Sequence, residues 1–177
     1  GANVMVAQYF GAKRRSELSD TVGTVITLTL LASIIIMIVG PLLVPPFLRM
    51  VDTPVEIFDM TSSYLTIYFL GIAGMAYYNI IAGVLRGMGD SVMPLIFLMA
   101  ACLTNIVLDL LFVAKFGWGV AGVAIATIIA QFLSASLCLF RLFRMKDTLD
   151  INLHTLKPHL LLAKELLILA CPPVCPR

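Results

Sequence analysis

Long runs without a charged residue are the feature that most constrains how this chain can fold. Residues 21–48, 60–85 and 116–140 contain no Asp, Glu, Lys or Arg. Each run exceeds the roughly 20 apolar residues that a helix needs to cross a bilayer. A further apolar run, residues 94–114, contains a single acidic residue. Because the hydrocarbon interior offers no water to backbone groups, a continuous apolar run of this length predicts a transmembrane helix.

The composition is that of an integral membrane protein. Of the 177 residues, 60% are hydrophobic and only 12% are charged, and the mean hydropathy is +1.02. A soluble domain of this length needs a more highly charged surface. The net charge of +2 is small and dispersed, which excludes the basic surface of a nucleic-acid-binding protein.

We therefore expect an all-α protein, a polytopic transmembrane helix bundle with four complete spans and partial spans at both ends. The breaks at Gly40-Pro41 and Pro45-Pro46 make helix continuity past Val39 doubtful. The first and last residues read as incomplete helices, so we expect an internal fragment of a longer protein. In a single domain of residues 1–177, the expected spans are about 1–12 (partial), 21–48, 61–85, 94–114, 117–140 and 160–177 (partial).

Basic residues alternate between the two ends of the expected spans. Nine of the twelve lie in residues 13–15, at Arg86 or within residues 141–164, whereas Arg49 and Lys115 fall in the alternate loops. Basic residues concentrate on the cytoplasmic side of membrane proteins. The loops at 13–20, 86–93 and 141–164 are therefore predicted to be cytoplasmic.

The run 94–114 contains an aspartate deep in a span. At about 1.5 Å per residue, Asp109 lies about 9 Å along the helix from Lys115. An ionisable side chain at such a depth costs about 2.5 to 3.5 kcal/mol on insertion scales, so it is expected to face the bundle interior or a wet cavity. Asn105 shares its helical face. The alternative is that Asp109 is only a structural hydrogen-bond acceptor.

Span 61–85 carries a stripe of aromatic, polar and small residues on one face. Its members are spaced at alternating steps of four and three residues, which places them on one side of a helix. They are Tyr64, Tyr68, Gly71, Met75 and Tyr78, with Asn79 beside them. The tyrosines are equally typical of an interfacial aromatic belt.

Small residues form a stripe in span 117–140. Gly122, Ala126 and Ala130 are spaced for close helix packing. Thr127, Gln131 and Ser134 form a neighbouring polar stripe, which could serve only interhelical hydrogen bonding.

The turn LRGMGD joins two spans. Gly87 and Gly89 allow a tight reversal, and Arg86 and Asp90 flank it as opposite charges. Apolar helices surround it, which excludes a phosphate-binding loop. Cys171 and Cys175 lack zinc-site spacing, so we expect no zinc site there, and no cofactor motif is present.

These strings, in this order and spacing, resemble the MATE (multidrug and toxic compound extrusion) family over nearly the whole chain. The LRGMGD turn is the most specific of them. The matching strings are VAQYFGAK at 6–13, LRGMGDS at 85–91 with Pro94, Asn105 to Asp109, and GWGVAGVA at 117–124 with Ala126-Thr127 and Gln131.

The resemblance implies a cation-coupled (Na⁺ or H⁺) antiporter that exports drugs, organic cations or toxic metabolites across a bacterial cytoplasmic membrane by alternating access. Such transporters have two six-helix lobes, and this chain resembles the amino-terminal lobe without its first helix. The missing first helix and the carboxy-terminal lobe would be its partners, besides the lipid bilayer and a small organic substrate.

Residue by residue, the resemblance to the DinF-like branch assigns a cation site to Asp109, Asn105 and Thr127, with Tyr64 nearby. Their oxygens suit Na⁺, and burial equally favours a protonated carboxyl at Asp109, so both ions stay open. Tyr68, Met75 and Tyr78 offer aromatic and thioether surface to a substrate, and Asn79 and Gln131 extend this path.

Two other functions remain open. One is a lipid-linked oligosaccharide flippase of the same superfamily, and the other is a membrane subunit that transports nothing. An enzyme is not expected, because the spans contain no histidine cluster, activated nucleophile or cofactor motif.

Overall fold

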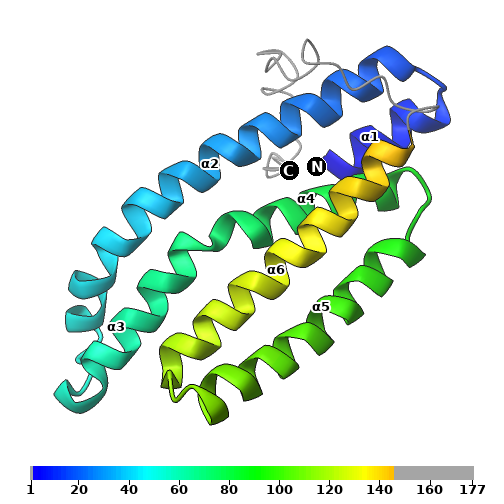
Figure 1. Cartoon of the computed structure of the whole chain (residues 1–177). Coiled ribbons are helices and arrows are strands. Elements are labelled where there is room, and N and C mark those ends of the chain that lie inside the picture. The colour runs from blue at the N-terminus through cyan, green and yellow to red at the C-terminus, as the bar shows by residue number, and fades with distance from the viewer. Residues whose placement is uncertain (1, 146–177) are drawn as a thin grey trace, which may run out of the picture.

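The computed structural model describes residues 2–145 as a bundle of helices (Figure 1). The all-α transmembrane bundle expected from the sequence is confirmed. The partial span at 160–177 and most of the loop at 141–164 lie outside the described residues. The elements are α1 (Ala2–Gly11), α2 (Arg15–Met50), α3 (Val55–Leu70), α4 (Ile72–Gly87), α5 (Val92–Leu110), the short π-helix η1 (Leu111–Lys115) and α6 (Gly119–Arg144).

Helix α2 continues through its prolines. It runs for 36 residues and contains Pro41, Pro45 and Pro46, so the doubt about helix continuity past Val39 was wrong. Gly40, Val44 and Leu48 are buried at intervals of four residues. A Cβ on Gly40 would lie 2.6 Å from Cγ of Phe69 in α3. This close packing against α3 holds the segment helical where local preference alone would end it.

The stretch expected as one span at 61–85 is two helices. Helices α3 and α4 meet at Gly71 with a bend of 45°. Gly71 is buried, and a Cβ there would overlap the side chain of Ile128 in α6. Glycine at the bend therefore lets α6 approach the backbone closely. The bend was not predicted from the sequence.

The helices lie side by side in the order α2, α3 with α4, α6 and α5 (Figure 1). Helix α6 is central, because it contacts α3, α4 and α5. The small residues expected to form a seam, Gly122, Ala126 and Ala130, are all buried in it. Helix α5 packs mainly on α6, at the edge of the bundle.

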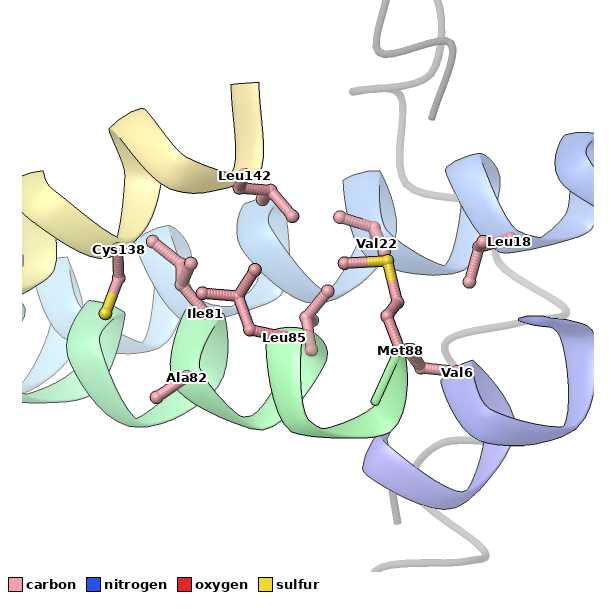
Figure 2. Close-up of a cluster of buried hydrophobic side chains, with 10 residues drawn as sticks. Val6, Leu18, Val22, Ile81, Ala82, Leu85, Met88, Cys138 and Leu142 are labelled. Atoms are coloured by element: carbon pink, nitrogen blue, oxygen red, sulfur yellow. The ribbon is translucent and has the colours of Figure 1, made fainter. Parts of the chain in front are cut away.

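The two groups of basic residues separate in space. The α1–α2 turn, the α4–α5 turn and the last turn of α6 lie at one end of the bundle, whereas the α2–α3 and α5–α6 turns lie at the other (Figure 1). At the first end a hydrophobic cluster joins α1, α2, α4 and α6 (Figure 2). Val6, Leu85, Cys138 and Leu142 in this cluster are fully buried.

The outer faces are apolar. Ile38 and Leu42 of α2 are 61% and 71% exposed, and Leu103 and Leu110 of α5 are each 65% exposed. Exposure of such large apolar faces to water is unfavourable, whereas their contact with lipid is not. Within residues 2–145, three helices are long and apolar enough to cross a membrane, and the bent α3–α4 pair makes a fourth span if it counts as one.

Candidate functional site

An open cavity of about 430 Å³ lies between the helices. We call it the polar cavity because its wall includes amide and hydroxyl side chains among apolar ones. It is bounded by the α3–α4 bend, by α5 and by α6. Seven of its lining residues were singled out in the sequence as cation-site or substrate-path residues. The lining comprises Tyr68, Met75, Tyr78, Asn79, Leu98, Ala101, Cys102, Asn105, Thr127, Ala130, Gln131 and Ser134.

The α3–α4 bend positions one wall. Across it, Tyr68 Oη donates a hydrogen bond to Met75 Sδ at 3.4 Å. One turn later, Asn79 Nδ2 donates to the Met75 carbonyl oxygen at 2.8 Å. Both polar side chains are thus tied to Met75, so the bend and the wall are held as one unit.

Tyr78 closes the end of the cavity nearest the LRGMGD turn. Its Oη donates to the Pro94 carbonyl oxygen in the first turn of α5 at 3.2 Å. A proline at this position removes no hydrogen bond, because the first turn of a helix lacks partners for its own N–H groups. The Tyr78 contact therefore links α4 to α5 without disturbing either helix.

Asn105 and Asp109 carry polar atoms that are buried and lack a partner in the described part of the chain. These atoms are Asn105 Nδ2 and Asp109 Oδ1, one helical turn apart on α5. A buried polar group without a hydrogen bond costs about 1 to 3 kcal/mol. The oxygen and nitrogen of an asparagine amide can exchange places by a flip. The pair therefore suits a cation held by two oxygens, and equally a ligand that offers one donor and one acceptor.

The helix changes its winding beside Asp109. The π-helix η1 begins at Leu111, and the Phe116 N–H bonds to the Leu111 carbonyl oxygen at 3.1 Å. Single π turns in α-helices are frequent at functional sites. Phe112, within the π-helix, stacks on Trp118 with 5.0 Å between ring centroids, and this contact supports the α5–α6 turn.

Thr127 and Ser134 present hydroxyl oxygens from α6. Thr127 Oγ1 donates to the Val123 carbonyl oxygen at 2.9 Å, and Ser134 Oγ donates to that of Gln131 at 2.9 Å. Each hydroxyl oxygen keeps lone pairs for a further partner.

Two expected cation-site residues do not line the cavity. Tyr64 stacks on Tyr68 with 6.1 Å between ring centroids, one turn outside the wall. Asp109 lies one turn beyond Asn105 and is also absent from the lining. Conversely, Cys102 was not identified as a site residue, although its spacing of three residues from Asn105 places both on one face.

The LRGMGD turn is fixed by close packing and by an ion pair. Gly89 has φ +91°, and a Cβ on Gly87 would lie 3.0 Å from the Asn3 carbonyl oxygen. Asp90 pairs with Arg141 of α6, a partner that the sequence reading did not identify, whereas Arg86 is exposed.

Comparisons with known proteins point to one family. A family model described as MatE matches residues 1–111. The probable multidrug resistance protein YoeA of Bacillus subtilis (strain 168) is 30% identical over 173 residues, which cover 96% of this chain and 37% of YoeA. The probable multidrug resistance protein YpnP of the same strain is 39% identical over 99 residues, or 56% of this chain and 22% of YpnP.

Solved structures share the fold. An inward-facing multidrug resistance MATE family transporter of the MOP superfamily superposes with a TM-score of 0.87 at 24% identity, covering 94% of this chain and 38% of that one. A MATE structure in complex with MaD3S gives a TM-score of 0.84 at 26% identity over 94% of this chain and 38% of that chain. The chain thus spans little more than a third of YoeA and of these solved transporters.

Proposed function

We propose a transport function for this chain, which belongs to the MATE family. MATE proteins are transporters and not enzymes. In our proposal, the complete protein is an antiporter of the DinF-like branch in a bacterial cytoplasmic membrane. It exports drugs, organic cations or toxic metabolites in exchange for Na⁺ or H⁺, and the loops at 13–20, 86–93 and 141–164 face the cytoplasm.

The observation that carries the proposal is the polar cavity with two unpartnered polar atoms beside it. Asn79, Thr127 and Ser134 donate hydrogen bonds to backbone carbonyls of their own helices, and their remaining acceptor capacity is available to a ligand in the cavity. Asn105 and Asp109 are therefore the residues that we assign to the coupling cation, with Thr127 contributing its hydroxyl oxygen from α6.

Coupling arises if the cation binds one conformation of the transporter, inward-facing or outward-facing, more tightly than the other. A cation shifts the inward–outward equilibrium only by its difference in affinity for the two conformations. Asp109 sits on α5, at the edge of the bundle, where a movement against a second lobe would change its surroundings. Alternating access of this kind needs the partner lobe, so the cycle is proposed for the complete protein, of which this chain would form part of one lobe.

The substrate would lie against the cavity wall. The ring faces of Tyr68 and Tyr78 can attract a cationic group, and the Met75 thioether adds polarisable surface. Asn79 and Gln131 would orient polar groups of the substrate. None of the described residues that line the cavity carries a formal charge, so we assign charge recognition to Asp109 and to other parts of the protein.

The experiment is efflux of a fluorescent organic cation from proteoliposomes that hold the complete transporter. Imposed Na⁺ and H⁺ gradients are applied separately, each with an ionophore that collapses it as the control. The proposal expects one gradient to drive efflux and its ionophore to stop it. Efflux that is independent of both gradients would overturn the antiporter assignment.

A further inference from the structure

A second hollow lies at the turn between α1 and α2, away from the polar cavity. It encloses about 540 Å³. Its wall includes three consecutive basic residues, Lys13, Arg14 and Arg15, and the aromatic side chains of Tyr9 and Phe10. From these observations we propose that the hollow binds the phosphate headgroup of an anionic lipid.

The backbone of the turn holds the basic residues in place. Lys13 adopts φ 55°. The Lys13 N–H bonds to the Phe10 carbonyl oxygen at 3.1 Å, and the Arg14 N–H bonds to that of Tyr9 at 3.0 Å. The reversal thus places three consecutive cations around the hollow, instead of spreading them along a helix.

Among the described residues, most of this positive charge has no strong ion-pair partner. The ion pair of Arg14 with Glu17 is long, at 3.8 Å, and both side chains are largely exposed, so it is weak. Lys13 and Arg15 are exposed and form no ion pair among the described residues. Asp20, farther along α2, does not line the hollow.

The hollow lies at the depth of lipid headgroups. The charge-free run of α2 begins at Thr21, so Arg15 is about 9 Å beyond it along the helix axis. A headgroup layer is about 5 to 8 Å thick on each side of the hydrocarbon, and long basic side chains reach across it. Phe10 is 37% exposed, whereas Leu18 is 1% exposed. The hollow therefore offers cations to a phosphate and apolar surface to the first carbons of a lipid.

This inference does not rest on the transport proposal. Any membrane orientation places the turn at an interface, and the charge complementarity with an anionic headgroup is the same at either one. A free phosphate would satisfy the cations equally, but it would leave the exposed apolar surface of Phe10 unused. We therefore assign the hollow to a lipid.

The test is native mass spectrometry of the whole protein, released from nanodiscs of mixed phosphatidylglycerol and phosphatidylcholine. We expect phosphatidylglycerol to be retained in preference. Lys13→Gln/Arg15→Gln should weaken its binding about 30-fold, which corresponds to about 2 kcal/mol for two cations at an anionic surface. The matched control, Arg49→Gln/Lys115→Gln, removes two cations at the other end of the bundle and should leave retention unchanged.

A second pair of variants tests the shape of the hollow without changing its charge. A Cβ on Gly11 meets no atom within 4 Å, so Gly11→Trp can fill the hollow while Gly11→Ala leaves it open. Gly11→Trp should abolish the preference and Gly11→Ala should keep it. Equal losses in the two double variants, an unaffected Gly11→Trp, or displacement of the lipid by millimolar inorganic phosphate would each overturn the lipid assignment.

Discussion

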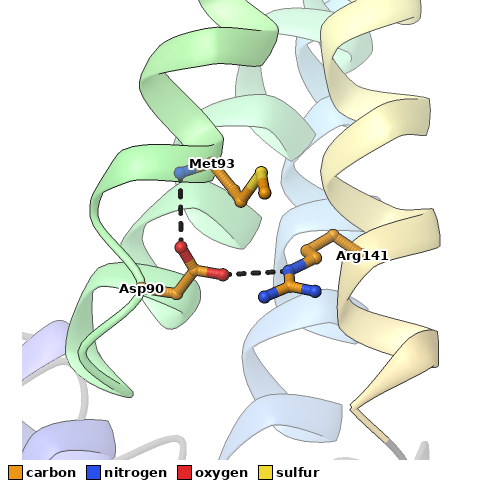
Figure 3. A network of polar contacts seen from close by, with 3 residues as sticks. All are labelled: Asp90, Met93 and Arg141. Carbon is orange, nitrogen blue, oxygen red and sulfur yellow. Dashed lines mark hydrogen bonds and ion pairs between the residues drawn. The ribbon is translucent and has the colours of Figure 1, made fainter.

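The Asp90 carboxylate joins two parts of the chain that are 51 residues apart. Its Oδ2 accepts a hydrogen bond from Arg141 Nε at 2.9 Å, and its Oδ1 accepts one from the Met93 N–H at 3.2 Å (Figure 3). The first contact reaches the last turns of α6, and the second reaches the first turn of α5. One carboxylate therefore fixes the α4–α5 turn to both neighbouring helices.

Asp90→Asn should lower the stability of the bundle. The amide keeps the shape but loses the charge, so the contact with Arg141 becomes a neutral hydrogen bond. Asp90 is 15% exposed and Arg141 is 36% exposed, and partial solvent screening limits the expected loss to about 1 kcal/mol in the free energy of unfolding. Thermal unfolding in detergent measures it. Arg144→Gln, an exposed change on the same helix turn, serves as the control, and an equal effect of both variants would contradict a specific role for Asp90.

Gly71→Ala should destabilise the bundle by about 1 to 3 kcal/mol, because the new methyl group overlaps Ile128 of α6. Gly71→Ala/Ile128→Ala should recover part of this loss, since the second change removes the overlapping atoms. Gly11→Ala, which adds a methyl group in open space, controls for the general effect of replacing glycine. Failure of the double variant to recover stability would show that the bend needs glycine for another reason.

Cys102 should report occupancy of the cavity. It is exposed and lines the cavity, whereas Cys138 is fully buried. In a Cys171→Ala/Cys175→Ala background, a membrane-permeant methanethiosulfonate should modify Cys102 and slow efflux. A bound organic cation should protect the thiol, and Cys102→Ala should make transport insensitive to the reagent. Rapid modification of Cys138, or no protection by substrate, would contradict this geometry.

Tyr68 and Tyr64 should differ in their effects on substrate binding. Tyr68 lines the cavity and Tyr64 does not. Tyr68→Leu should therefore weaken the binding of an organic cation by about 1 kcal/mol, or about fivefold in Kd, through loss of a cation–π contact. Tyr64→Leu keeps similar bulk outside the wall and should change Kd less than twofold. Equilibrium binding by the purified complete transporter measures both values.

Much of the fold could be predicted because transmembrane helices can be recognised in a sequence from their length and hydropathy. The runs without charge predicted the helices, and the spacing of Gly122, Ala126 and Ala130 predicted the buried seam of α6. The helix through Pro41, Pro45 and Pro46 could not be predicted, because its continuity depends on packing against Phe69 of α3. Tertiary contacts of this kind override local preference.

The candidate site was predicted less completely than the fold. Helical spacing placed Asn105 and Asp109 one turn apart on one face, and Thr127, assigned from the family resemblance, lines the cavity together with Asn105. The bend at Gly71 could not be anticipated, because a glycine in a helix does not say whether the chain bends there. Tyr64 and Tyr68 share one face of α3, and only Tyr68, the one nearer the bend, lines the cavity.

We propose that Asp109 couples a cation gradient to export, and a single efflux measurement tests this role. It compares gradient-driven efflux by the complete transporter with that of Asp109→Asn and of Asp59→Asn, a matched change at an exposed position in α3. We predict that Asp109→Asn inserts normally and still binds substrate, but loses efflux driven by the coupling gradient, while Asp59→Asn keeps it. Undiminished efflux by Asp109→Asn would show that Asp109 does not couple the gradient to export.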